Sequence, residues 1–405
     1  MYEVLALLAA FALLYSSLAG GIERTRVSGP ILFLLFGLVV GPAGLGLLDI
    51  EVAGEELRTL AELTLALVLF TDASGSDFAV LRRYAQLPVR LLLVGLPLTI
   101  GLGYVAGLAL FDHLSVFEVA LLATMLAPTD AALGQAVVSN EAVPSPVRQG
   151  LNVESGLNDG ICVPILFLFL ALAGAGGEGE GDAGWGLALR LVASEIGIGA
   201  GTGLVLTAAA VALLRLCKAR GWISETWIQI PVVALALTCF TVAQLLGGSG
   251  FIACFVGGLL FGARTGEYRE ELVLAAEGTG STLSLLTWVT FGAVVVGPNL
   301  GKVSVPIVLY AILSLTVIRM LPVFLCLQGL RAGTEEKLFI GWFGPRGLAS
   351  IVFAVIVVDA RVPHADTLSA VVAFTVLLSI VAHGVSANPW ARAFGARHPE
   401  VATPE

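Results

Sequence analysis

The sequence predicts an all-α polytopic membrane protein with thirteen transmembrane helices. Its 405 residues are 57% hydrophobic and only 13% charged, and the mean hydropathy is +0.95. A membrane-spanning helix needs about 20 predominantly apolar residues, and Gly, Pro and charge clusters divide the chain into thirteen such stretches. The stretches are 2–20, 29–48, 57–76, 88–111, 115–138, 147–174, 186–216, 226–246, 250–263, 272–297, 303–329, 336–358 and 365–387.

Several stretches have features that a plain membrane helix lacks. The first begins with Glu3 and has no basic segment before its apolar run, so we expect a retained span and not a signal peptide. The fifth and twelfth contain Pro128 and Pro345, which predict interrupted helices because proline removes a backbone hydrogen bond. The sixth and eleventh carry charged side chains at membrane depth.

The seventh stretch contains glycines at positions 197, 199, 201 and 203. A nucleotide-binding loop would need a strand before it, and this segment is an apolar helix. Small residues spaced by four positions instead predict close packing against another helix.

The distribution of Lys and Arg predicts the orientation in the membrane. Cytoplasmic connections carry the excess of these residues, and most of the 21 fall in alternate connections on one side. Those on that side are Arg24, Arg26, Arg82, Arg83, Arg90, Arg148, Arg215, Lys218, Arg220, Arg264, Arg269, Arg331, Lys337, Arg392 and Arg397. We therefore expect the N-terminus outside, the C-terminus in the cytoplasm, and an inner (plasma) membrane location.

Composition argues against two classes of function. The net charge of −9 does not indicate a nucleic-acid partner, and none is expected. The five cysteines are scattered among the spans without a C-x-x-C pair, so neither a disulfide framework nor a metal centre is indicated. No cofactor is expected.

The most informative segment is residues 150–160, where two carboxylates interrupt an apolar span. Charge at the bilayer centre costs several kcal/mol, about 2.5 to 3.5 on insertion scales, and normally marks an ion or proton pathway. Helical geometry places Ser155 and Asp159 on one face and Glu154 and Asn158 on another. Carboxylate and hydroxyl oxygens suit a hard cation such as sodium. The alternative is that the two carboxylates satisfy each other and nearby donors.

Charges next to the two prolines indicate a second feature of the same site. Asp130 follows Pro128 by two residues, and Arg346 follows Pro345 directly. Broken backbone at membrane depth is tolerated where it is buried or lines a cavity, and paired interrupted spans indicate a transporter binding site in inverted repeats. The two charges would also offset the partial charges of half-helix ends. An ordinary kink, with Asp130 near an interface, is the alternative.

Two further charged residues need an explanation. Arg319 lies inside the eleventh stretch and requires a carboxylate partner, for which Glu154 is our choice because its face points away from Ser155 and Asp159. Asp72, near the inner end of the third stretch, is a weaker candidate. It either lines the access route or adds a ligand, or it is an interfacial residue.

The combination of these motifs resembles a known family. Residues 127–130 (Ala-Pro-Thr-Asp), 154–159 (Glu-Ser-Gly-Leu-Asn-Asp), Arg319 and residues 344–347 (Gly-Pro-Arg-Gly) are similar to the monovalent cation/proton antiporters of the NhaP type, relatives of animal sodium/hydrogen exchangers. The resemblance extends from about the second to the thirteenth stretch.

The resemblance implies an NhaA-like fold with two unwound, crossed helices and a homodimer. By position, Asp159 would carry the cation or proton, with Asp130, Ser155 and Thr129 as further sodium ligands. Asn158 would steady the unwound segment. An Asn before the essential Asp implies electroneutral, one-to-one exchange. Some relatives have Glu where this chain has Asp72, which leaves that ligand in doubt.

We expect a single integral membrane unit, residues 1–405, with two parts. The ion-binding core would comprise about 88–175 and 303–388, and the dimerisation scaffold about 1–87 and 186–297. Arg346, and the pair formed by Glu154 and Arg319, would support the core.

Several other functions are alternatives to antiport. A rhomboid-like protease could use the Gly-Gly-Ser-Gly segment 247–250 with His383 as base, but the segment falls in a short turn where glycine and serine are ordinary. The Gly-x-Gly-Asp signature of presenilin-like aspartyl proteases is absent at Asp159. A cation channel, a potassium/proton exchanger or a bile-acid-type symporter on the same fold are the nearer alternatives.

Overall fold

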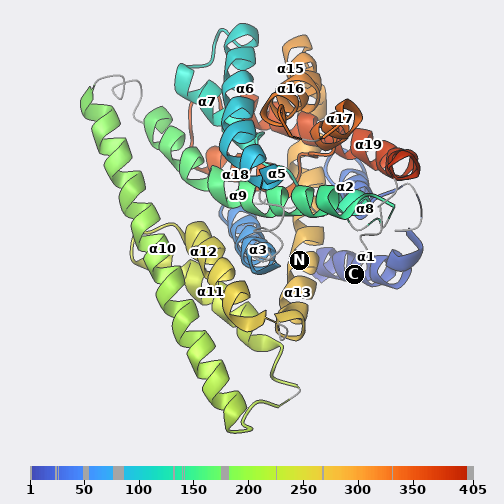
Figure 1. Ribbon diagram of the computed structural model, residues 1–405. Coiled ribbons are helices and arrows are strands. Elements are labelled where there is room, and N and C mark those ends of the chain that lie inside the picture. The colour runs from blue at the N-terminus through green and yellow to red at the C-terminus, as the bar shows by residue number, and fades with distance from the viewer. Residues whose placement is uncertain are drawn as a thin grey trace.

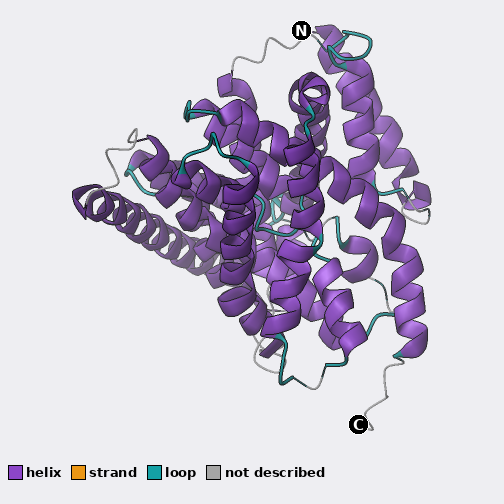
Figure 2. Ribbon diagram, turned by 90° about the horizontal axis from the view of Figure 1, so that it is seen from above, coloured by secondary structure: helices purple, strands orange, loops and turns teal. Residues whose placement is uncertain are grey.

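The structure is a computed structural model. Its described residues form helices and loops, and none of them lies in a strand (Figures 1 and 2). The described residues are 2–22, 25, 27–48, 54–75, 86–130, 133–138, 140, 142–174, 182–224, 226–266, 269–330 and 332–398. Five of the residues behind the predicted orientation, Arg24, Arg26, Arg82, Arg83 and Arg331, lie outside them.

The first half of the chain runs from α1 to α9. Its helices are α1 (Tyr2–Ile22), α2 (Gly29–Val40), α3 (Gly54–Gly75), α5 (Gln86–Arg90), the π-helical segment η1 (Leu91–Gly95), α6 (Leu96–Leu110), α7 (Val116–Met125), α8 (Gln135–Val138) and α9 (Ser145–Gly174). The second half comprises α10 (Asp182–Ala219), α11 (Ile230–Leu245), α12 (Gly250–Thr265), α13 (Arg269–Thr290), the π-helical η4 (Phe291–Val296), α14 (Gly297–Asn299), the 3-10 turn η5 (Leu300–Lys302), α15 (Val305–Leu315), α16 (Val317–Cys326), α17 (Thr334–Trp342), α18 (Leu348–Asp359) and α19 (Ala365–Arg397).

Each of the thirteen predicted stretches coincides with one of these helices or with two or three consecutive helical segments. Seven segments in the described part are long and apolar enough to cross a bilayer, and shorter apolar helices include α2, α7, α11, α12 and α18. The remaining stretch is α3, which carries several charged residues. The predicted polytopic all-α class is therefore confirmed.

The helices pack in two neighbourhoods that meet at α3. Helix α12 packs against α10, α11 and α3, and α3 also contacts α13 and α18. Helix α7 packs against α6 and α9, while α15 packs on α19 and α16 on α17. In Figure 1, α11, α12 and α13 lie in the lower half of the view, α6, α7, α15 and α16 lie in the upper half, and α10 runs along the left side.

Glycines allow the tight contacts of α12. A β-carbon added at Gly258 would lie 2.4 Å from the Phe70 carbonyl oxygen of α3, so the two helix backbones approach closely there. On the α10 side, added β-carbons at Gly199 and Gly203 would lie 2.5 Å and 2.3 Å from backbone oxygens of the α12 segment. The predicted packing role is confirmed for these two glycines of the seventh stretch, whereas positions 197 and 201 face open space.

Two predicted spans are broken into half-helices. Helix α7 starts with a capping box, in which Ser115 and Glu118 exchange hydrogen bonds with each other's backbone N–H. It ends at Met125, shortly before Pro128, because proline drives the residue before it out of the helical region. Pro345 likewise lies between α17 and α18. A third break, at Thr316 between α15 and α16, carries no proline and was not predicted.

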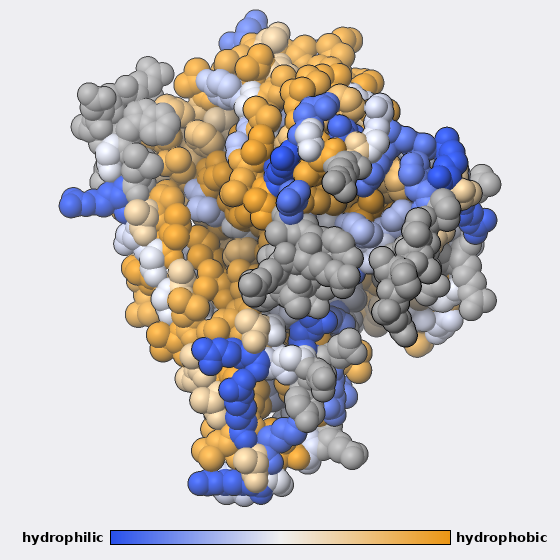
Figure 3. All heavy atoms as spheres, viewed as in Figure 1, coloured by the Kyte–Doolittle hydropathy of each residue, from blue (hydrophilic) through white to orange (hydrophobic). Residues whose placement is uncertain are grey.

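The surface agrees with a membrane location. Large apolar side chains are exposed on the outer helices, and α1 has no buried residue along its described length. Figure 3 shows one face with large apolar areas, and its hydrophilic residues gather at the lower end and toward the upper right.

Candidate functional site

Asp130 links the two interrupted spans. Its backbone N–H donates to the Pro345 carbonyl oxygen at 2.8 Å, which joins the two broken segments directly. Its Oδ2 accepts the N–H of Leu348, the first residue of α18, at 2.7 Å. Its Oδ1 accepts the N–H of Leu133, which follows the first break, at 3.0 Å. The carboxylate therefore satisfies the free N–H at the positive end of a half-helix.

Arg346 makes the reciprocal contact at the other break. Its guanidinium donates to the carbonyl oxygen of Ala127 and, at 3.2 Å, to that of Pro128, just beyond the end of α7. A third contact reaches the Ser314 carbonyl at 3.5 Å. Arg346 is fully buried, so these carbonyls and the negative end of α7 offset its charge. Each broken span thus supplies the charge that stabilises the helix end of the other.

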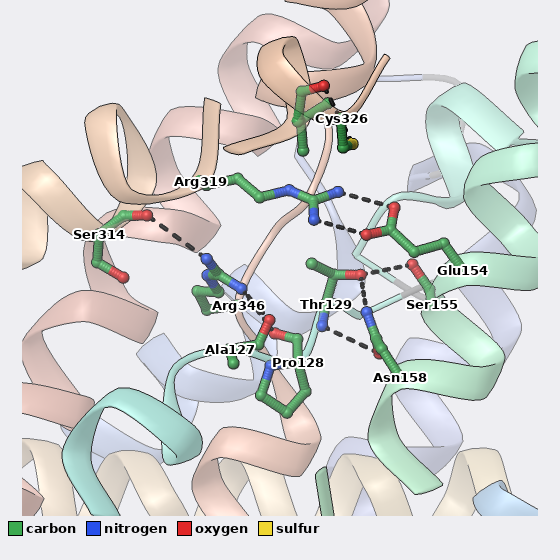
Figure 4. Close-up of polar contacts among 11 residues, drawn as sticks. Ala127, Pro128, Thr129, Glu154, Ser155, Asn158, Ser314, Arg319, Cys326 and Arg346 are labelled. Carbon is green, nitrogen blue, oxygen red and sulfur yellow. Dashed lines mark hydrogen bonds and ion pairs between the residues drawn. The ribbon is translucent and has the colours of Figure 1, made fainter. Parts of the chain in front are cut away.

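A small hydrogen-bonded cluster holds Thr129 of the first break against α9 (Figure 4). The Thr129 N–H donates to Asn158 Oδ1 at 3.3 Å, and the Asn158 amide donates back to Thr129 Oγ1 at 2.7 Å. Ser155 Oγ lies 2.9 Å from the same threonine hydroxyl. All three side chains are buried, so α9 fixes the unwound backbone of the first interrupted span.

Glu154 and Arg319 form the predicted ion pair. Arg319 Nη1 and Nη2 donate to the two Glu154 carboxylate oxygens at 2.5 Å and 2.8 Å, and each residue is only 1% exposed (Figure 4). The guanidinium passes over Gly344, where an added β-carbon would lie 2.3 Å from Arg319 Nε. The pair therefore joins α9, α16 and the second broken segment.

Helix α19 supports the second break from a different side. Ser379 Oγ accepts the Arg346 N–H at 2.7 Å. The buried His383 places Nε2 2.8 Å from the carbonyl oxygen of Trp342, the last residue of α17. These contacts satisfy backbone groups that the break leaves without helical partners. They give His383 a structural position, which differs from the role of a protease base that was weighed from the sequence.

Asp159 lines a cavity of about 550 Å³. It is 8% exposed, and its Oδ1 has no hydrogen-bond partner in the described part of the chain. The other polar residues that line the cavity come from α3, α9, α13 and the first break, and they include Asp72, Asp130, Arg148, Gln149, Asn152, Glu277, Ser281 and Ser284. A buried carboxylate oxygen without a donor is the feature that a cation or proton would complete.

Asp72 and Glu277 face this cavity from α3 and α13, and both side chains are exposed. Asp72 therefore lines the cavity, and its role as an access-route residue, a ligand or an interfacial residue stays a prediction. Glu277 was not predicted as a site residue, although it lies near the start of the tenth predicted stretch. The pattern that could have indicated it is the same as for Asp159, a carboxylate in an apolar span.

The predicted site residues thus fall into two sets. Asp159, Asp130 and Asp72 share the cavity. Thr129 bonds to both Ser155 and Asn158, and neither Thr129 nor Ser155 is among the described residues that line the cavity. Their roles as ion ligands stay predictions.

Gly347 offers a test of the contact between the two breaks. A β-carbon there would lie 1.9 Å from Asp130 Oδ2, so Gly347→Ala must displace the carboxylate from the start of α18. We expect a loss of about 1–3 kcal/mol in unfolding free energy, typical of overpacking, measured by thermal unfolding in detergent. Gly101→Ala, where nothing lies within 4 Å, is the control. Equal stability of the two variants would contradict the contact.

Crossed, interrupted helices around a carboxylate-lined cavity define a membrane transporter of the inverted-repeat class. More particularly, the chain belongs to the family described as sodium/hydrogen exchanger, transmembrane, which matches residues 7–393. The family resemblance predicted from the sequence is confirmed, and the family and fold are those of transporters.

Individual relatives agree with this assignment. The chain is 25% identical over 393 residues to the K(+)/H(+) antiporter NhaP2 of Shewanella sp. (strain ANA-3), covering 96% of this chain and 66% of that protein. It is 27% identical over 343 residues to the Na(+)/H(+) antiporter of Saccharomyces cerevisiae, covering 80% of this chain and 34% of that protein. The chain therefore spans only part of the length of these relatives.

A solved structure has the same fold. The sodium proton antiporter MjNhaP1 from Methanocaldococcus jannaschii aligns with a TM-score of 0.80 at 21% identity, covering 98% of this chain and 99% of that one. The predicted antiporter fold is confirmed by this likeness.

Proposed function

We propose that this protein is a secondary antiporter that exchanges a monovalent cation for protons across a membrane. The observation that carries the proposal is Asp159, a buried carboxylate with an unpartnered Oδ1, within the described part of the chain, on a cavity shared with Asp130 and Asp72. Membership of the exchanger family supports it. The protein would act without a cofactor and without enzymatic chemistry.

The coupling follows from the cost of a bare charge at this position. A buried carboxylate is strongly disfavoured unless something neutralises it. Either a cation or a proton can do so at Asp159, but not both at once. If the site crosses the membrane only when neutral, each cation moved one way is exchanged for a proton moved the other way. Asp130 would add a second carboxylate while its oxygens remain bonded to backbone N–H groups.

The moving part would be the core of residues 88–175 and 303–388, sliding against the scaffold of 1–87 and 186–297. The cavity lies near the end of α3 that bears Asp72, the cytoplasmic end in the predicted orientation, with the N-terminus outside and the C-terminus inside. We place the protein in the inner (plasma) membrane as a homodimer. The exposed apolar helix α1 supports a lipid or subunit contact on the scaffold.

Sodium is the cation that we propose, because the site offers hard oxygen ligands. Potassium is the second candidate, because the similar Shewanella proteins are K(+)/H(+) antiporters by name. A channel is a less suitable alternative, since channels use rings of weak, repeated sites and these carboxylates converge on one cavity.

Proteoliposome exchange tests the function and its stoichiometry. Sodium, lithium or potassium is added on one side, and proton release is followed with the membrane voltage clamped. With Asn158 before Asp159, we expect saturable, cation-dependent proton movement that does not respond to voltage. A rate that follows the voltage would reject one-to-one exchange, and cation flux without proton movement would reject antiport.

A further inference from the structure

Helices α3 and α18 pack together, and the two ends of their contact have different surroundings. At one end, Asp72 of α3 and Leu348 of α18 both line the cavity that contains Asp159. At the other end, Arg58 of α3 contacts Asp359, the last residue of α18. The positions of Arg58 and Asp72 are separated by about 21 Å along the helix at 1.5 Å per residue. The cavity and the ion pair therefore lie at opposite ends of one helix contact.

A second carboxylate, that of Glu62 on α3, also contacts Arg58. Arg58 Nη1 donates to Asp359 Oδ2, and Arg58 Nε donates to Glu62 Oε1 at 2.6 Å. The side chains of Arg58, Glu62 and Asp359 are 38%, 14% and 28% exposed. The guanidinium fork thus holds a carboxylate of its own helix and one of the partner helix at the same time.

We propose that Arg58 and Asp359 form a gate that keeps the end opposite the cavity closed. The inference rests on the proposed antiport, in which α18 of the core moves against α3 of the scaffold. Opening a path at the Arg58 end requires these two helix ends to separate, which breaks this ion pair. Glu62 would then keep Arg58 paired on its own helix.

The exposure of the pair suits repeated opening. Partly exposed charges regain water when they separate, so an ion pair of this kind contributes little to stability. The buried Glu154 and Arg319 pair is the opposite case, because its separation would leave charges without water. The pair of Arg58 and Asp359 can therefore bias an equilibrium between a closed and an open conformation. The pair of Glu154 and Arg319 instead fixes helices within the core.

Cavity accessibility tests the gate without requiring transport. Ser281, an exposed residue of the cavity, is replaced in Ser281→Cys on a Cys217→Ser background, since the other four native cysteines are buried. A membrane-impermeant thiol reagent is added to either face of oriented membrane vesicles. In Arg58→Gln we expect labelling from the Arg58 side to rise by up to about fivefold, in line with the small strength of exposed ion pairs.

Three further variants decide the result. Asp359→Asn should produce the same rise, and the double variant should add nothing to either single change, because both remove one interaction. Arg397→Gln breaks a partly exposed pair with Glu335, at 2.7 Å, which joins α19 to α17 and not to α3, and should leave labelling unchanged. Unchanged labelling in Arg58→Gln and Asp359→Asn, or an equal rise in Arg397→Gln, would overturn the gate. Because labelling needs no ion exchange, a failure of the proposed antiport would be seen separately in proteoliposomes.

Discussion

Replacing Asp159 with asparagine is expected to reduce cation-driven proton movement to the level of protein-free liposomes. The amide keeps the size of the side chain but can neither hold a proton in exchange nor neutralise a cation. Because Oδ1 accepts no hydrogen bond within the described part, the fold should lose little support. The measurement is proton release from proteoliposomes after addition of sodium or potassium, with thermal unfolding of the same sample in detergent.

Asp112→Asn is the matched control for this change. The Asp112 side chain is fully exposed and lies in the connection after α6, away from the cavity. It should retain full exchange. Exchange that survives in Asp159→Asn would show that another carboxylate carries the ion, and Asp72 or Glu277 would then be the next candidates because both line the cavity.

The helices and the two breaks next to prolines could be predicted because their signals are local. Apolar length predicts a span, and proline predicts an interruption. The pair of Glu154 with Arg319 could also be predicted, since a buried arginine needs a carboxylate and few are available in the spans. The break at Thr316 could not be predicted, because it has no proline and depends on how α15 and α16 pack.

The detailed contacts of the site depend on tertiary packing that spacing alone does not define. Ser155 and Asp159 are four residues apart, and the sequence favours a shared cation. In the structure Ser155 meets Thr129, while Asp159 faces the cavity. Helical spacing gives the angle between two side chains but not which neighbouring element each one meets. The same limit applies to Asp130, whose two backbone donors come from different segments.

Glu154→Gln is expected to have the largest effect on stability. It leaves the Arg319 guanidinium buried without its counter-charge, and removal of one partner from a buried pair costs about 3–5 kcal/mol. Unfolding in detergent, by heat or denaturant, measures the loss. Glu335→Gln, which removes one partner of the partly exposed pair with Arg397, should cost less than about 1 kcal/mol. Similar losses in the two variants would contradict the buried role.

A double replacement separates the charge from the contact. Glu154→Leu with Arg319→Met removes both charges, so it should be more stable than Glu154→Gln alone, since replacing a buried pair with apolar residues is often neutral. Neither Glu154 nor Arg319 is among the described residues that line the cavity. The folded fraction of the double variant should therefore still couple cations to protons, which Asp159→Asn should not. Loss of coupling in a well-folded double variant would place the pair in the transport step itself.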